Sequence, residues 1–133
     1  KEGIKNVFED IIRNKPSEWL SLGSSGETYQ LLPAFLDLFH KQRVKSQIKV
    51  RGLLLNTPKS RKRGELLGKM KLSEIRYLPK TFITPTVMNI YNERITLYSV
   101  TEEKIPFIIF IESKELSKSF REYFESLWKI AKP

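Results

Sequence analysis

The sequence predicts a single α/β domain with a mixed β-sheet flanked by helices. Strand-like and helix-like segments alternate between residues 18 and 78, which implies parallel strands joined by right-handed crossovers. Two strand-like segments at 86–91 and 95–100 are separated by the short polar connection 92–94, which is typical of an antiparallel hairpin. The chain has 133 residues, 40% of them hydrophobic, and this is enough for one domain with a buried core.

The first fifteen residues predict an amphipathic helix that Pro16 ends. Its apolar side chains recur at helical spacing; they are Ile4, Val7, Phe8, Ile11 and Ile12. We expect residues 1–15 to form a linker helix packed on or leading into the domain, and residues 16–133 to form the α/β domain itself. The apolar stripe needs a partner surface, either the domain core or a second copy of the chain.

The middle of the chain predicts three strands and two crossover helices. Residues 18–22 are typical of a strand, and the Gly-Ser-Ser-Gly segment at 23–26 is the loop at its carboxyl end, either a ligand-binding loop or a plain turn. A helix from Pro33 to Lys45 buries Leu32, Phe35, Leu36, Phe39 and Leu38. The remaining segments are a central strand at 48–55, a basic loop, a short helix near 64–70 and a strand at 74–78.

The last third predicts a hairpin, a turn at 101–106, a buried strand at 107–111 and a final helix. Ser113 is placed to cap this helix, and Glu115 suits its first turn. The predicted core face of the helix comprises Leu116, Phe120, Tyr123, Phe124, Leu127 and Ala131, with Trp128 beside them.

The net charge of +9 is concentrated in one stretch. Residues 41–80 hold thirteen basic and two acidic side chains, whereas residues 1–40 carry −2 and residues 81–133 carry 0. A cluster follows Pro58, formed by Lys59, Arg61, Lys62 and Arg63. Clustered cations attract nucleic acids, although the same cluster also suits a solvated loop and helix face.

The composition excludes several kinds of chemistry. The chain has no cysteine and one histidine, so thiolate sites, metal sites built on paired histidines and mechanisms that need two imidazoles are ruled out. We expect no metal and no cofactor, and we interpret His40 as a cation at the end of its helix or as a packing residue. No apolar run approaches the roughly 20 residues that cross a bilayer, so we expect a cytoplasmic protein without membrane contacts.

The final segments resemble one repeat of the phospholipase D-like fold. The helix ends in Phe124 and Trp128 as in that superfamily, and Tyr98-Ser99 occupies the place of its Gly-Ser pair. By this resemblance Thr84, Thr86 and Tyr91 stand where the superfamily has its catalytic His, Lys and Asp. Because a nucleophilic imidazole has no substitute in this segment, we do not expect an enzyme.

Most of the chain is similar to the non-catalytic phospholipase D-like domain of TrmB-like transcriptional regulators. The similarity rests on residues 39–43 with 47–50, 74–79, 89–95 and 120–131. It implies a regulatory domain that senses an effector or positions a homodimer, with DNA bound by an upstream winged helix-turn-helix domain. A cleft at the strand ends would bind a small polar or anionic effector through candidate residues Ser24, Ser25, Glu27, Arg43, Arg76, Asn89 and Asn92. The alternative is a module that binds nucleic acid directly through residues 41–80.

Overall fold

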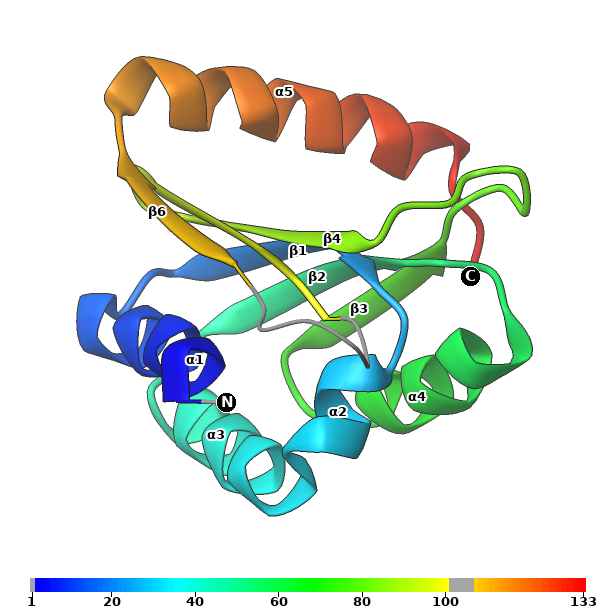
Figure 1. The fold of residues 1–133 in the computed structure, drawn as a ribbon, viewed down its shortest axis with the longest axis horizontal. Coiled ribbons are helices and arrows are strands. Elements are labelled where there is room, and N and C mark those ends of the chain that lie inside the picture. The colour runs from blue at the N-terminus through cyan, green and yellow to red at the C-terminus, as the bar shows by residue number, and fades with distance from the viewer. Residues whose placement is uncertain (1, 101–106) are drawn as a thin grey trace.

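A six-stranded sheet forms the middle of the computed structural model, which describes residues 2–100 and 107–133 (Figure 1). In chain order the elements are α1 (Glu2–Asn14), β1 (Glu18–Ser24), α2 (Glu27–Leu31), α3 (Pro33–Lys45), β2 (Lys49–Leu54), α4 (Pro58–Gly68), β3 (Ser73–Tyr77), β4 (Thr86–Tyr91), β5 (Arg94–Ser99), β6 (Ile108–Glu112) and α5 (Lys114–Ile130). The predicted turn at 101–106 lies outside the described residues.

The sheet is mixed, as predicted. Its strand order is β3-β2-β1-β4-β5-β6; β1 pairs in parallel with β2, and β2 with β3, whereas the β1–β4, β4–β5 and β5–β6 pairs are antiparallel. Helices α1 to α4 all lie on one face of the sheet, and α5 crosses the opposite face by itself (Figure 1). The structure thus confirms the predicted α/β class. Among the described residues, no helix combines the length and apolar character needed to cross a membrane.

Helix α1 packs on the domain core. Ile4, Val7 and Ile11 are fully buried against the sheet and α3. The Tyr91 hydroxyl of β4 donates a 2.7 Å hydrogen bond to Asp10 of α1, and burial together with this bond raises the pKa of Tyr91. Of the two expected partners for the apolar stripe, the structure selects the core of the same chain.

Helix α5 is held on its face by one arginine of β2. The Arg51 guanidinium donates to Glu18 of β1 at 2.9 and 3.1 Å, and to Glu125 of α5 through two bonds of 2.7 Å. It also lies 5.4 Å from the ring centroid of Phe124 and 5.2 Å from that of Trp128. The bond from Arg51 lowers the pKa of Glu125. One side chain therefore joins two strands to the helix.

The predictions of burial are wrong for β6 and for part of α5. The strand at 107–111 is not buried: β6 is the edge strand, and Ile109 and Phe110 are 43% and 49% exposed. In α5, Leu116 and Tyr123 are exposed rather than part of the core face, and the inward side is formed by Ser117, Phe124 and Trp128. The predicted cap is present, because Ser113 Oγ accepts a bond from the Leu116 amide.

Smaller departures concern the helices. Leu38 of α3 is exposed, although Leu36 and Phe39 are buried as predicted. The five-residue helix α2 follows directly after residues 23–26, where only a loop was expected. Helix α4 begins at Pro58, so the basic cluster lies in its first two turns and not in a loop before it.

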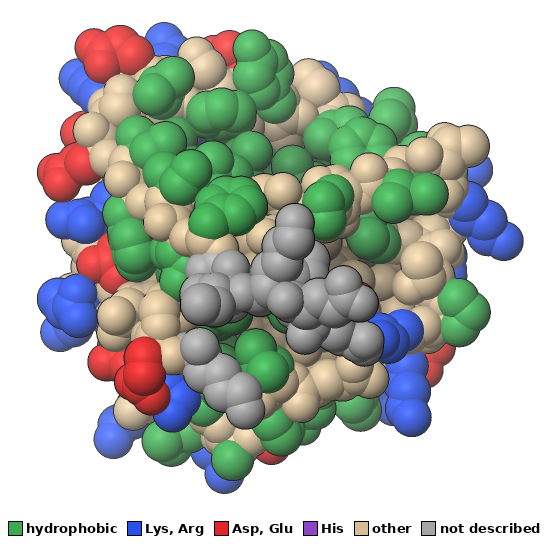
Figure 2. Space-filling view, viewed as in Figure 1, with side chains coloured by type: hydrophobic (Ala, Val, Ile, Leu, Met, Phe, Trp, Pro, Cys, Tyr) green, Lys and Arg blue, Asp and Glu red, His purple; other side chains and the backbone are tan. Residues whose placement is uncertain are grey.

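An apolar surface remains where α5 meets β6. It consists of Phe107 and Ile109 on the strand side and Leu116 and Tyr123 on the helix, and we call it the α5–β6 surface. Figure 2 shows apolar side chains gathered over this upper part of the molecule. Exposed apolar patches are typical of interaction sites.

Replacing Arg51 with Met is expected to lower the free energy of unfolding by about 2 kcal/mol, because Glu18 and Glu125 lose their shared partner and α5 its link to β2. Urea denaturation followed by tryptophan fluorescence measures this. The control is Lys62→Met, which removes the same charge from an exposed site and is expected to change stability by less than about 0.5 kcal/mol. Equal stabilities for the two variants would contradict the assigned role of Arg51.

Candidate functional site

An open groove lies at the carboxyl ends of β1 and β2. Its volume is about 750 Å³, and it is lined by the loop after β1, the start of α4 and the segment before β4. Ser25, Glu27, Thr57 and Lys59 are its polar residues nearest the strand ends. In α/β folds this edge of the sheet is the usual place for a ligand. We call it the edge groove.

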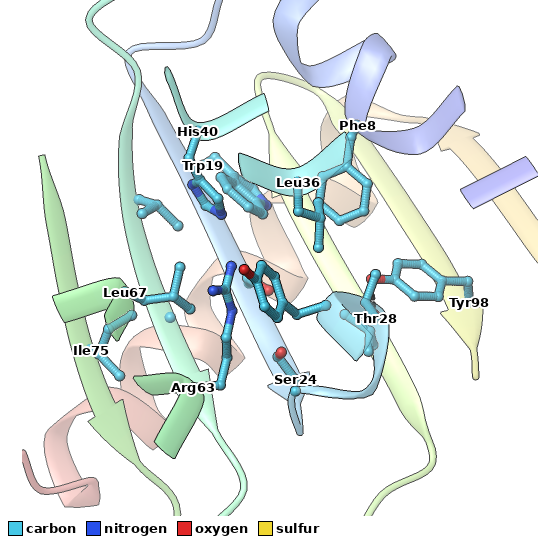
Figure 3. A pocket seen from close by; sticks show the side chains of 16 residues that line it. Phe8, Trp19, Ser24, Thr28, Leu36, His40, Arg63, Leu67, Ile75 and Tyr98 are labelled. Atoms are coloured by element: carbon cyan, nitrogen blue, oxygen red, sulfur yellow. Dashed lines mark hydrogen bonds between the residues drawn. The ribbon is translucent and has the colours of Figure 1, made fainter. Parts of the chain in front are cut away.

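A smaller cavity adjoins the edge groove beneath the sheet (Figure 3). Its volume is about 50 Å³, and it lies between the sheet and helices α1 to α4. The cavity and the groove share Thr28 and Val87 in their walls, so they are neighbours. Its polar wall residues include Ser21, Ser24 and His40, together with Arg63.

Small residues on two paired strands create this space. Ser21 of β1 pairs with Gly52 of β2, and both side-chain positions face the helices. Their neighbours along the same face, Trp19 and Val50, are large and fill the adjacent core. A methyl group added at Gly52 would lie 3.0 Å from Ile75, so glycine keeps this wall open.

Of the residues that the structure describes, Arg63 is the one charged side chain that lines the cavity. It is only 7% exposed, and its guanidinium carbon lies 3.8 Å from the centroid of the Tyr29 ring. Within residues 2–100 and 107–133 it has no ion-pair partner or hydrogen-bond acceptor. Burial lowers the pKa of Arg63, and the field of nearby Asp37, which accepts a bond from the Tyr29 hydroxyl, acts in the opposite direction.

His40 is a buried, neutral packing residue, which decides between its two predicted roles. Its Nδ1 accepts a 3.1 Å bond from Arg43 Nε, so the single proton of the neutral ring resides on Nε2. Burial, together with the charges of Arg43 and Arg63, lowers the pKa of His40 to about 3. At neutral pH the ring is therefore a hydrogen-bond donor at the cavity wall.

The predicted effector residues do not form one cleft. Ser24 lines the cavity, and Ser25 and Glu27 line the edge groove. Asn92 lies in the β4–β5 turn, where its amide donates to the Asn14 carbonyl. These residues therefore divide between the candidate site and a distant turn.

The other three predicted residues have structural contacts. Arg43 is fully buried and donates to the carbonyls of Ile48 and Leu72 and to the Ser73 hydroxyl. Arg76 lies on the α5 face, stacked on Trp128 at 4.4 Å and bonded to its carbonyl. Asn89 is fully buried, where it accepts a 2.8 Å bond from Trp19 Nε1 and donates to Thr96.

The basic cluster is divided by the helix that carries it. Lys59, Arg61 and Lys62 are exposed, and Arg61 stacks on Tyr77 at 4.2 Å. Arg63 points inward to the cavity and is not part of an exposed patch. Periodicity within α4 was the available signal, because Ser60, Arg63 and Gly64 are its buried positions.

The three positions that correspond to the catalytic residues of the phospholipase D-like fold do not converge. Thr84 lines the edge groove, where its hydroxyl accepts a bond from the Thr86 amide. Tyr91 is the last residue of β4 and lies at the opposite end of the strands from the edge groove, where its hydroxyl is bonded to Asp10. Within the described part of the chain, no group of three acidic or histidine side chains is arranged to hold a metal ion.

No family model matches the chain, and no curated protein is similar enough in sequence to count as a relative. A solved structure does match: that of TrmBL2, an archaeal chromatin protein with a novel mode of DNA binding, at a TM-score of 0.59 and 15% sequence identity. The match covers 96% of this chain and 50% of TrmBL2. The chain folds like one half of TrmBL2. It therefore shares its fold with part of a DNA-binding, TrmB-like protein, and it spans about half the length of that protein.

The neutral state of His40 gives a testable pH dependence. An unfolded histidine takes up a proton below its ordinary pKa of about 6.5, whereas folded His40 resists protonation down to a pKa of about 3. Stability is therefore lost as pH falls below about 6.5. Between pH 7 and pH 5 the wild type is expected to lose up to about 2 kcal/mol more than His40→Asn, which keeps an acceptor for Arg43 but does not titrate. Urea titrations at each pH measure the difference, and parallel curves for the two proteins would contradict it.

Proposed function

We propose that this chain is a non-catalytic regulatory domain of a TrmB-like DNA-binding regulator. The observation that carries the proposal is the match of nearly the whole chain to half of TrmBL2, a DNA-binding protein. We assign DNA recognition to a separate winged helix-turn-helix domain, as the resemblance to TrmB-like regulators implies. The domain described here would position two such heads, sense a small polar or anionic effector, or both.

The absence of catalysis is part of the proposal. Within the phospholipase D-like interpretation, a threonine replaces the nucleophilic histidine at Thr84 and another replaces the lysine at Thr86. Neither hydroxyl has a neighbouring histidine as a base, because His40 is in α3 and is bonded to Arg43. Tyr91, at the position of the aspartate, is buried in the core. These residues support a role in structure and regulation.

We place homodimer formation on the α5–β6 surface. Helix α1 offers no apolar stripe for a second copy, because Ile4, Val7 and Ile11 are buried within the chain. In contrast, β6 is the last strand of the sheet, and Ile109 and Leu116 expose apolar surface beside it. An antiparallel edge can pair with the same edge of a second copy across a two-fold axis, which satisfies the backbone groups of both strands.

Sedimentation at high protein concentration tests this placement. The wild type is expected to be a dimer, and Ile109→Lys combined with Leu116→Glu is expected to be a folded monomer, because charge is introduced on both sides of the surface. Leu38→Glu is the control, since Leu38 is 56% exposed on the opposite face. A strictly monomeric wild type, or a double variant that stays dimeric, would contradict the placement.

Direct nucleic-acid binding is the alternative, and one observation favours it. Of the thirteen basic residues in 41–80, nine are exposed; the other four are Arg43, Arg51, Arg63 and Arg76. Exposed lysines and arginines contact phosphates without reading the base sequence. Such contacts could flank a site that is read by the separate DNA-binding domain.

Electrophoretic mobility of a DNA duplex distinguishes the two functions. The proposed regulatory role predicts that the isolated chain does not shift the duplex at low salt, whereas the complete protein that contains it does. The alternative predicts a shift that weakens steeply as salt rises and that Lys59→Ala combined with Lys62→Ala reduces. The matched control is Lys118→Ala with Lys129→Ala on α5, which removes two exposed charges from the other face. A salt-sensitive shift lost only in the first pair would overturn the assignment of DNA binding to another domain.

A further inference from the structure

We infer that the cavity beneath β1 and β2 binds a compact oxyanion, a phosphate or carboxylate group, with Arg63 as its cationic partner. The inference rests on the proposed regulatory function for its biological meaning, because it names the class of effector that the domain would sense. The anion site itself is inferred from the side chains that line the cavity, and this inference does not depend on DNA binding.

Arg63 has no ion-pair or hydrogen-bond partner among the described residues. The other three internal arginines of the basic stretch all have acceptors: Arg43 has two carbonyls, Arg51 has two carboxylates and Arg76 has the Trp128 carbonyl. Arg63 is as buried as many core residues, yet among the described residues its guanidinium makes no ion pair or hydrogen bond and stacks on the Tyr29 ring. No fully buried side-chain nitrogen or oxygen of the described residues lacks a partner, so the guanidinium nitrogens reach accessible space. A buried charge is costly unless an opposite charge or acceptors compensate it. An anion in the cavity would supply that compensation.

The cavity wall carries hydrogen-bond donors from several elements. Figure 3 shows Arg63 extending from α4 into the cavity, between Ser24 at one end and His40 at the other. The Ser21 hydroxyl is at the wall, 7% exposed, and donates to no acceptor among the described residues. The His40 ring adds an N–H donor at Nε2. Donors from the sheet, α3 and α4 therefore line one small space.

Among the described residues, no carboxylate lines this space. The residues that line the cavity include neither Asp nor Glu. Two acidic groups of the described residues lie outside it: Glu27 lines the edge groove, and Asp37 accepts the Tyr29 hydroxyl at 3.1 and 3.3 Å. The described wall is thus positive at Arg63 and otherwise neutral. The Arg63 guanidinium can therefore donate charge-assisted hydrogen bonds to an oxyanion.

The volume of the cavity suits a small anion. A cavity of about 50 Å³ has room for roughly three or four water-sized groups, which suits a single phosphate or carboxylate group and excludes a nucleotide or a sugar ring. The adjoining edge groove, at about 750 Å³, is large enough for the remainder of a bigger molecule that carries such a group. Thr28, shared by both, lies at the passage between them.

A bound anion would tie three elements together. Arg63 belongs to α4, Tyr29 to α2 and Ser21 to β1. Thr28 of α2 is already joined to the sheet by a 3.1 Å bond with the Tyr98 hydroxyl. Filling the cavity would fix α2 and α4 against the sheet, and the expected readout is a rise in thermal stability, since a ligand that binds the folded state stabilises it.

Calorimetric titration and thermal unfolding test the inference, with inorganic phosphate and acetate as probes in NaCl of matched ionic strength. The wild type is expected to bind at least one probe saturably and to unfold at a higher temperature in its presence. Phosphate alone would indicate a phosphate group, and acetate alone a carboxylate. Arg63→Met, which keeps an unbranched apolar side chain but removes the guanidinium that stacks on Tyr29, is expected to weaken binding about tenfold or more. Without anion this variant is expected to be at least as stable as the wild type, because an uncompensated buried charge is gone.

Lys62→Met is the matched control, because it removes the same charge from the adjacent exposed position and is expected to bind like the wild type. If Arg63→Met does not fold, amide chemical shifts of the wild type decide: phosphate or acetate must perturb Ser21 and Gly52 more than the exposed turn at Asn92. No saturable binding of either probe, equal binding by Arg63→Met, or uniform shifts would overturn the inference. Because these measurements contain no DNA, their failure leaves the regulatory proposal standing, and a failed DNA experiment leaves the anion site standing.

Discussion

The sheet changes from parallel to antiparallel between β1 and β4, and a buried hydrogen-bond chain keeps this junction in register. Trp19 donates to Asn89, which donates in turn to Thr96 of β5. Because side chains alternate between the two faces, a one-residue slip of β4 would move Asn89 to the α5 side and separate it from both partners. The same register carries Tyr91 to the α1 side of the sheet. It also leaves Ser21 facing the helices, where it opens the cavity.

Periodicity predicted the regular elements because their burial is itself periodic. The stripe of α1, the helix from Pro33 to Lys45 and the hairpin each follow from local spacing of apolar residues. Burial of 107–111 could not be predicted in this way, since an apolar run does not reveal whether its strand lies inside the sheet or at the edge. The short helix α2 gives no local signal either: its N-cap position is Gly26 and has no side-chain cap.

The candidate site was predicted only in part, because the basic residues of 59–63 were grouped by their sequence positions. Their positions on the inward or outward face of a helix were not considered. Thr57 caps α4 and Pro58 occupies its first turn, a start signal that places positions 60, 63 and 64 on one inward face. That signal separates Arg63 from its exposed neighbours. Asn89 and Arg43, in contrast, are polar residues whose long-range partners no local pattern reveals, so the sequence could not show that both side chains bond within the fold.

The placement of α5 alone on its face has a consequence for synthesis of the protein. Leu20, Leu53, Leu78 and Ile90 form the apolar surface that Phe124 and Trp128 cover. Helices α1 to α4 are made before residue 70 and can cover the other face early, but this surface stays open to water until residues 114–131 have emerged from the ribosome. During that interval one face of the sheet in the nascent chain is uncovered. Its protection against aggregation therefore depends on a helix that begins about sixty residues after the end of β2.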